Sequence, residues 1–246
     1  MRVLAGLLLG VATCGAQMTP LGGVSFVSTA PGTTVVSGNT GEGQSCASGG
    51  GESGGATCIL PVFTISHAGS AVYLHVAWCE DSECSTTPAA AVTATDNCGN
   101  IYTQVIVHLQ NSWSQVVLVA SNAGAGSCTI SLSQAGHGLW YTRWLLIECI
   151  GADKASPVDS AVSKTANGTG TAVSITSAGV TTAQGELVIA DFDVTNPSNT
   201  GTCTTLQTDN ASFIEMTASP APGTPITCSL TESSANWWST IIGIQP

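Results

Sequence analysis

The sequence predicts an all-β protein, an antiparallel β-sandwich of jelly-roll or immunoglobulin-like type with minimal helix beyond its first residues. Strand-like segments recur at short intervals along the chain and are separated by Gly, Ser, Asn or Pro. Only 8% of the residues are charged, whereas a helical protein carries Lys, Glu and Arg on its solvated face. No segment combines a sustained 3.6-residue apolar period with helix caps.

The chain begins with features of a secretory signal peptide at residues 1–16. Arg2 supplies the positive charge, a short apolar run follows, and small residues precede a cleavage point after Ala16. The run is shorter than the ~20 residues that span a bilayer, and no later apolar run reaches that length. A bacterial lipobox with a lipid anchor on Cys14 is the alternative, although Thr13 fits that motif poorly. We expect a secreted, extracellular or cell-surface protein.

The predicted strands follow the period-two alternation of half-buried strands. They lie near residues 24–28, 60–66, 71–79, 90–95, 101–108, 114–120, 127–133, 139–150, 172–177, 186–193, 212–217, 226–231 and 237–244. In the third, apolar residues alternate with Tyr73 and His75. Segment 144–150 is apolar on both faces, which predicts a central strand. Residues 96–100 have the composition of a hairpin turn.

Residues 17–246 are expected to form a single disulfide-stapled domain, because nothing has the composition of an interdomain linker. Two packed subdomains meeting near residues 153–170 are the alternative. The glycine-rich residues 38–57 are interpreted as a surface loop, and residues 196–199 as a turn.

The chain has ten cysteines, and nine remain if Cys14 leaves with the signal peptide. Secretion makes disulfides the expected use, and no C-x₂-C pair indicates zinc. Local context predicts the pairs Cys46–Cys58, Cys79–Cys84, Cys98–Cys128 and Cys203–Cys228. The ninth, Cys149, lies in an apolar run and is predicted to be a buried thiol outside the disulfides. A reactive or intermolecular cysteine is the alternative.

Four segments of the chain have a familiar pattern. They are residues 90–97 with 99–102, 146–151, 157–159 and 185–189. They resemble segments of uncharacterised bacterial secreted β-sandwich proteins, over roughly residues 60–195 and weakly at the C-terminal strand. The resemblance implies the sandwich fold and no activity.

The formal net charge of −11 at pH 7 restricts the partners. Phosphate backbones need Lys and Arg to neutralise them, so nucleic acid is excluded, as is electrostatic attachment to anionic lipid. No cofactor is expected, although an acidic surface can attract Ca²⁺.

Two groups of acids are candidate metal sites. Asp191 and Asp193 lie two apart on one predicted strand, so they face the same side about 6.6 Å apart. This spacing touches that of inverting glycosidase carboxylates and suits Ca²⁺; a solvated strand end is the simpler interpretation. Glu80, Asp81 and Glu83 crowd a short turn that also suits a hard cation, or is simply solvated.

Glu148 lies inside the most apolar predicted strand and shares a face with Trp144 and Leu146. A buried carboxylate is costly unless it is paired or hydrogen-bonded. Arg143 points to the opposite face, so the partner is expected from another strand or from backbone N–H groups. A structural role is expected, and a perturbed catalytic acid is the alternative.

An exposed tryptophan on a sandwich face would provide a stacking surface for sugars. The candidates are Trp140, Trp144, Trp237 and Trp238. Adjacent residues of a strand point to opposite faces, so Trp237 and Trp238 cannot both enter one core. Packing in the core or under a loop is the simpler interpretation.

These features favour a non-catalytic extracellular structural or adhesin-like protein: a surface, matrix or filament subunit that self-assembles or binds glycans. One alternative is a carbohydrate-binding module that uses an exposed Trp. Another is a glycoside hydrolase-like enzyme that uses Asp191 and Asp193, or Glu148. Asn167 and Asn210 begin sequons for glycosylation.

Overall fold

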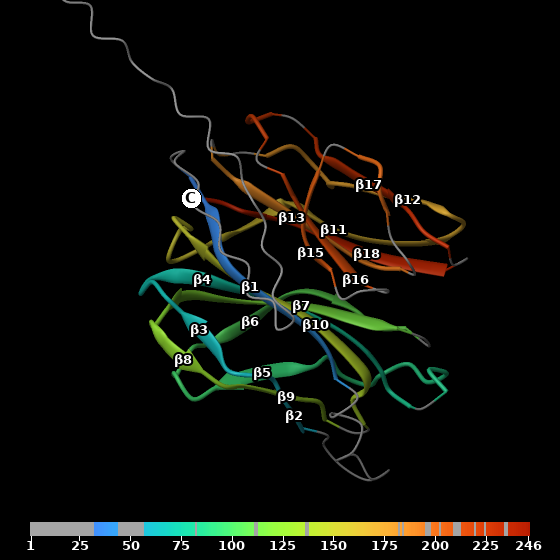
Figure 1. Ribbon diagram of the computed structural model, residues 1–246, viewed down its shortest axis with the longest axis horizontal. Coiled ribbons are helices and arrows are strands. Elements are labelled where there is room, and N and C mark those ends of the chain that lie inside the picture. Colours follow the sequence, from blue (N-terminus) through green and yellow to red (C-terminus); the bar gives the residue numbers. More distant parts are fainter. Residues whose placement is uncertain are drawn as a thin grey trace, which may run out of the picture.

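The computed structural model describes residues 32–43, 57–81, 83–110, 113–135, 138–181, 183, 185–194, 198–201, 203–208, 213–218, 220–223, 225–233 and 236–246. These residues form antiparallel sheets and no helix (Figure 1). The predicted all-β class is therefore confirmed. In the same residues, no helical segment has the length and apolar character needed to cross a membrane.

Strands β1 to β10 form the lower half of Figure 1. They are β1 (Thr34–Gly43), β2 (Thr57–Ile59), β3 (Phe63–Ile65), β4 (Ser70–Cys79), β5 (Thr93–Asp96), β6 (Tyr102–His108), β7 (Ser114–Ala123), β8 (Gly126–Cys128), β9 (Ile130–Ser133) and β10 (Trp140–Ile150). Five make a large sheet in the order β1-β10-β4-β7-β6, and the short strands form β2-β9-β5 and β3-β8. Between the large sheet and the short strands lies an apolar core that includes Leu74, Trp78, Leu118 and Ile130.

Strands β11 to β18 form the upper half. They are β11 (Val158–Thr169), β12 (Ala172–Thr176), β13 (Leu187–Asp193), β14 (Ser198–Asn199), β15 (Thr204–Thr208), β16 (Phe213–Ala218), β17 (Thr227–Thr231) and β18 (Asn236–Ile244). Five make a second large sheet, β11-β18-β13-β16-β15, and three make the small sheet β12-β17-β14. A second apolar core, with Phe192, Leu230 and Ile241, lies between these two sheets.

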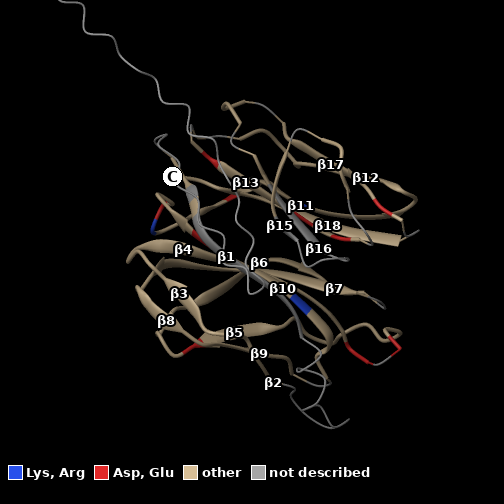
Figure 2. Ribbon diagram, viewed as in Figure 1, with Lys and Arg blue, Asp and Glu red and all other residues tan. Residues whose placement is uncertain are grey.

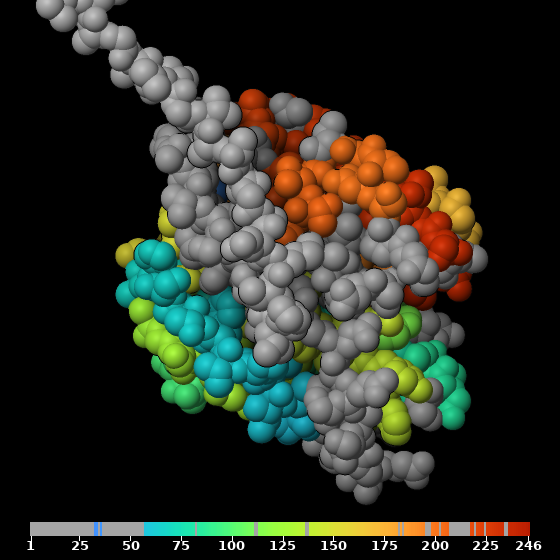
Figure 3. All heavy atoms as spheres, viewed as in Figure 1, coloured from blue at the N-terminus to red at the C-terminus, as the bar shows by residue number. Residues whose placement is uncertain are grey.

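A third apolar cluster lies between the two large sheets, with Tyr73 and Ile147 from one and Ile189 and Ile242 from the other. At the edges of the contact, β1 meets β15 and β6 meets β11. The central strands β4 and β13 are buried along their whole length, because each has its own core on one face and the opposite large sheet on the other. The sheets thus stack in layers, and the two halves lie one above the other (Figure 3).

Most predicted strands within the described residues coincide with observed ones, and segment 144–150 lies in β10, between β1 and β4, as expected. The loop interpretation of residues 38–57 is wrong for residues 38–43, which belong to β1, and for Thr57, which begins β2. Strands β2, β11, β14 and β15 were not predicted either, and β14 occupies Ser198–Asn199 of the segment interpreted as a turn. Strands β1, β11 and β15 are edges of the large sheets and carry many polar residues or glycines, so the apolar period is weak. The signal peptide and the strand near 24–28 lie outside the described residues.

Charged residues are sparse over the whole ribbon, and acids far outnumber cations (Figure 2). The placement of one cation matters for the site. Arg143 on β10 points toward the second large sheet, where it pairs with Asp193 of β13.

Candidate functional site

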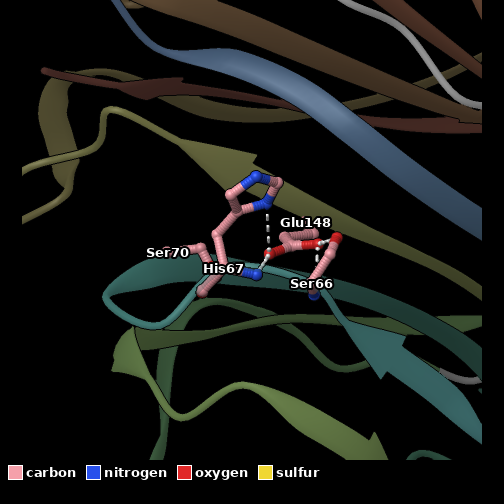
Figure 4. Close-up of polar contacts among 4 residues, drawn as sticks. All are labelled: Ser66, His67, Ser70 and Glu148. Carbon is pink, nitrogen blue, oxygen red and sulfur yellow. Dashed lines mark hydrogen bonds and ion pairs between the residues drawn. The ribbon is translucent and has the colours of Figure 1, made fainter.

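The Glu148 carboxylate is buried at the end of β10, where it fastens the connection between β3 and β4 (Figure 4). It accepts hydrogen bonds from Ser66 N–H at 3.0 Å, Ser66 Oγ–H at 2.6 Å and His67 N–H at 2.8 Å. His67 Nδ1 lies 3.5 Å from the same carboxylate. The prediction that backbone N–H groups serve as partners of Glu148 is confirmed.

These donors determine the chemistry that Glu148 can perform. Burial raises the pKa of its carboxyl, but the hydrogen bonds from Ser66 and His67 outweigh burial and hold the pKa below its ordinary value. In a nucleophilic triad, serine donates to the imidazole, which the acid orients. Here the serine hydroxyl donates to the carboxylate itself. The cluster therefore has a structural role: the ionised Glu148 fixes the β3–β4 connection to β10.

Asp191 and Asp193 face the first large sheet from β13, and both are buried. Tyr73 donates its hydroxyl hydrogen bond to Asp191 Oδ2, and His75 Nδ1 lies 3.1 Å from the same oxygen. Arg143 Nη1 lies 2.6 Å from Asp193 Oδ1. The interpretation as a solvated strand end is wrong, because the second large sheet is covered by the first. Both carboxylates are engaged by groups from the opposite sheet.

An aromatic cluster lies beside this ion pair. The Arg143 guanidinium sits 4.3 Å from the centroid of Trp113, a cation–π contact. The Tyr141 ring is tilted against both Trp113 and Trp140, with centroids 6.4 Å apart in each case. Tyr141 is 45% exposed. Its φ of 49° lies where the β10–β4 register shifts, a backbone conformation that costs about 1–3 kcal/mol outside glycine.

The four tryptophans singled out from the sequence have different environments. Trp144 is 4% exposed and packs in the first core, which leaves its ring no open face. Trp237 is half-buried against the second core. Trp238 is half-buried and pairs across the sheet with Asp193. Trp140 is half-buried and belongs to the aromatic cluster.

The acidic turn after β4 is organised by internal hydrogen bonds. Glu80, expected to be solvated, is buried and accepts a hydrogen bond from Gln134 Nε2, which corrects that expectation. A side-chain hydrogen bond from Thr86 and the N–H of Ser85 lower the pKa of Asp81. The third acid, Glu83, is exposed.

Nowhere in the described part of the chain do three or more His, Cys, Asp or Glu side chains converge as a metal site would require. The Ca²⁺ prediction for the acidic turn and for the β13 aspartates therefore gains no support from the geometry.

Three of the predicted disulfides are present: Cys79–Cys84, Cys98–Cys128 and Cys203–Cys228. Cys58 is also disulfide-bonded, while its predicted partner Cys46 and the lipobox Cys14 lie outside the described residues. Cys149 is buried and outside the disulfides, as predicted. Of the two sequons, Asn167 is exposed on β11 and Asn210 lies outside the described residues.

Sequence reasoning did not select Trp113 or Tyr141 as site residues, and it missed the pairing of His75 with Asp191. The sequence did contain a signal for the pairing of His75 with Asp191, because Tyr73 and His75 share one face of a strand whose other face is apolar. The signal for Tyr141 was absent, because a local register shift directs it to solvent. No family model matches the chain, and neither the curated proteins nor the solved structures contain a detectable relative.

Proposed function

We propose that the protein is a non-catalytic extracellular protein of the structural or adhesin-like class. The main observation in its support is that every acid considered for catalysis is already paired with hydrogen-bond donors or a cation of the protein itself. Glu148 clasps a loop, and Asp191 and Asp193 join the two large sheets. A glycosidase acid needs a raised pKa, whereas that of Glu148 is lowered. The three disulfides fit an oxidising compartment.

Two measurements on the purified protein test this proposal. Sizing and negative-stain imaging at high concentration, with adsorption to cells and insoluble polysaccharides, are expected to show assembly or surface binding. Release of reducing ends from the same polysaccharides is expected to be absent. A monomer that adsorbs to nothing contradicts the proposal. So does a hydrolytic activity that Glu148→Gln abolishes and the exposed control Glu83→Gln retains.

A carbohydrate-binding role is the second candidate, favoured by the position of Tyr141. Tyr141 is strained and 45% exposed and lies beside Trp113 and Trp140, and strained residues concentrate at functional sites. Tyr141→Ala is expected to weaken binding on a glycan array about ten-fold, by loss of ring contact. Val107→Ala, which truncates an exposed apolar side chain on β6, is the control. Equal binding by both variants refutes this candidate.

A further inference from the structure

The two halves of the chain have the same strand order. In each large sheet the first strand of its half pairs with the last, followed by the same three strands: β1-β10-β4-β7-β6 and β11-β18-β13-β16-β15. The facing short strands agree as well, since β2-β9-β5 and β12-β17-β14 occupy corresponding places in the chain order. A shared order of eight strands is a strong indication of one fold present twice.

Irregular features recur at equivalent places. A β-bulge lies between Gln104 and Ile106 in β6, and another between Thr205 and Gln207 in β15. In each case the bulge faces two consecutive residues of the next strand. Bulges are conserved features of related folds, and an identical position in both halves fixes the residue equivalence across each sheet.

The disulfides correspond in the same way. Cys98–Cys128 joins the turn after β5 to β8, and Cys203–Cys228 joins the segment after β14 to β17. Both bridges therefore tie the segment that leads into the fifth strand of the large sheet to the opposite, short-stranded layer. In the first half the bridge ends on β8, which directly precedes β9, and in the second half it ends on β17, the equivalent of β9.

Two kinds of turn also recur. Asp96 Oδ1 at the end of β5 accepts the N–H two residues on, at 3.0 Å, and Asn199 Oδ1 at the end of β14 does the same at 2.9 Å. Gly69 before β4 has a φ of 87°, and Gly185 before β13 has a φ of 83°. Each glycine lies the same number of residues before the equivalent positions of its strand. Glycine adopts this positive φ without strain, whereas other residues do not.

A buried carboxylate that accepts a loop N–H is present in both halves, but it belongs to residues at different sequence positions. Glu148 in β10 is equivalent to Gly243 in β18 by sheet register. A Cβ added at Gly243 would overlap the carboxylate of Glu186, which occupies that space instead. Glu148 accepts the N–H of His67, and Glu186 accepts that of the equivalent Ala183 at 3.4 Å. The carboxylate is thus kept in space although its position in the sequence differs.

The halves pack as the subunits of a twofold dimer do. The first strand β1 meets β15, and its equivalent β11 meets β6, which is the equivalent of β15. The same pair of strands therefore makes contact at both edges, the mark of an isologous interface. The central strands β4 and β13 face one another, so the rotation axis runs between them.

His75 and Asp191 meet on this axis. In the first large sheet, Ile106 next to the bulge pairs with Val117, which pairs with His75 on the next strand. In the second large sheet, the equivalent Gln207 pairs with Glu215, which pairs with Asp191. The two residues hold one equivalent position, yet they differ in charge type and lie 3.1 Å apart. Pairing a half with its own copy would instead oppose two imidazoles, or two buried carboxylates.

We propose that the chain is a tandem repeat of one β-domain, whose two large sheet faces are complementary interaction surfaces that each take the other repeat as partner. The His75–Asp191 contact selects this pairing, because like groups at the axis penalise either self-pairing. On this proposal the single sandwich expected from the sequence is two sandwiches, joined by the connection between β10 and β11.

The test uses the full chain with a protease site inserted between Lys154 and Ala155, in the exposed connection. The only cysteines after this point are Cys203 and Cys228, which bond to each other, so no disulfide holds the halves together after cleavage. Analytical ultracentrifugation of the cleaved protein is expected to show one complex of both halves.

His75→Asp is expected to raise the dissociation constant of the cleaved halves more than about 100-fold, since it places two carboxylates together. Adding Asp191→His is expected to restore the affinity to within about ten-fold of the native pair, because the positions are equivalent. Thr165→Val, which removes a 3.4 Å contact with His108 at the β6–β11 edge away from the axis, is the matched control and should weaken the affinity less than about ten-fold.

Separation of the native halves on cleavage overturns the proposal, as does full affinity in the His75→Asp protein. A double variant no better than His75→Asp also overturns it, because equivalence predicts recovery. If His75→Asp prevents folding of the intact chain, circular dichroism of the double variant decides: a native spectrum supports the proposal and an unfolded one overturns it.

Discussion

Replacing Glu148 by Gln is the sharpest test of how acids stabilise this fold. The native carboxylate accepts three hydrogen bonds from Ser66 and His67, at 3.0, 2.6 and 2.8 Å. A hydrogen bond to a charged group contributes about 1.5–3 kcal/mol. Glutamine keeps the volume and one acceptor oxygen, but its amide NH₂ must then face a donor. We expect the free energy of unfolding to fall by about 2–4 kcal/mol at pH 7.

Urea unfolding followed by tryptophan fluorescence measures this loss. With a slope near 3 kcal/mol/M, the midpoint should fall by about 1 M. Ser66→Ala, which removes the hydroxyl and leaves both N–H donors, should produce a smaller shift in the same direction. Glu83→Gln changes an exposed acid and should leave the midpoint in place.

The pH dependence of this stability loss tests whether the ionised carboxylate of Glu148 is its cause. The hydrogen bonds hold the pKa of Glu148 below its ordinary value of 4.5, so the folded state favours the ionised form. This stabilisation is complete above the unfolded-state pKa and is lost as the pH falls through the folded-state pKa. The difference between the native protein and Glu148→Gln should therefore be constant from pH 7 to about 4.5 and close below it. A difference that persists unchanged at pH 3, or no difference at pH 7, would refute the reasoning.

Three further outcomes are expected. Arg143→Met should cost about 3 kcal/mol by leaving the Asp193 carboxylate without its guanidinium partner, and adding Asp193→Leu should recover most of it in a thermal melt; equal melting temperatures for both variants would contradict this. Trp144→Ala should cost about 3–5 kcal/mol in urea titration because it empties part of the first core, and a surface-like loss below ~1 kcal/mol would show that the ring is not packed there. Thiol counting on denatured, unreduced mature protein should find only Cys149, and any other count contradicts the disulfide pattern.

Local patterns in the sequence predicted local structure well. Alternation found β4, and the apolar run at 144–150 identified a central strand. The tight spacing of Cys79 and Cys84 identified their bridge. The partners of Glu148 were also predicted correctly in kind, because burial of a carboxylate demands donors and the neighbouring cation was on the wrong face.

Contacts between distant layers could not be predicted. Asp191 and Asp193 read as a polar strand end because the covering sheet belongs to the other half of the chain. The sequence analysis did not detect the similarity between the two halves for a related reason. Equivalent residues differ in chemistry, as Glu148 and Gly243 do, so the repetition exists in strand order and geometry and leaves little trace in residue identity.

The connection between Ile150 and Val158 has a thermodynamic consequence. Two domains joined by so short a segment meet at an effective concentration of about millimolar or above, whatever the concentration of the protein. A weak sheet-to-sheet contact is therefore enough to keep the faces closed, and dilution does not open them. The association of the halves, which in a true dimer depends on expression level, becomes a fixed property of each molecule.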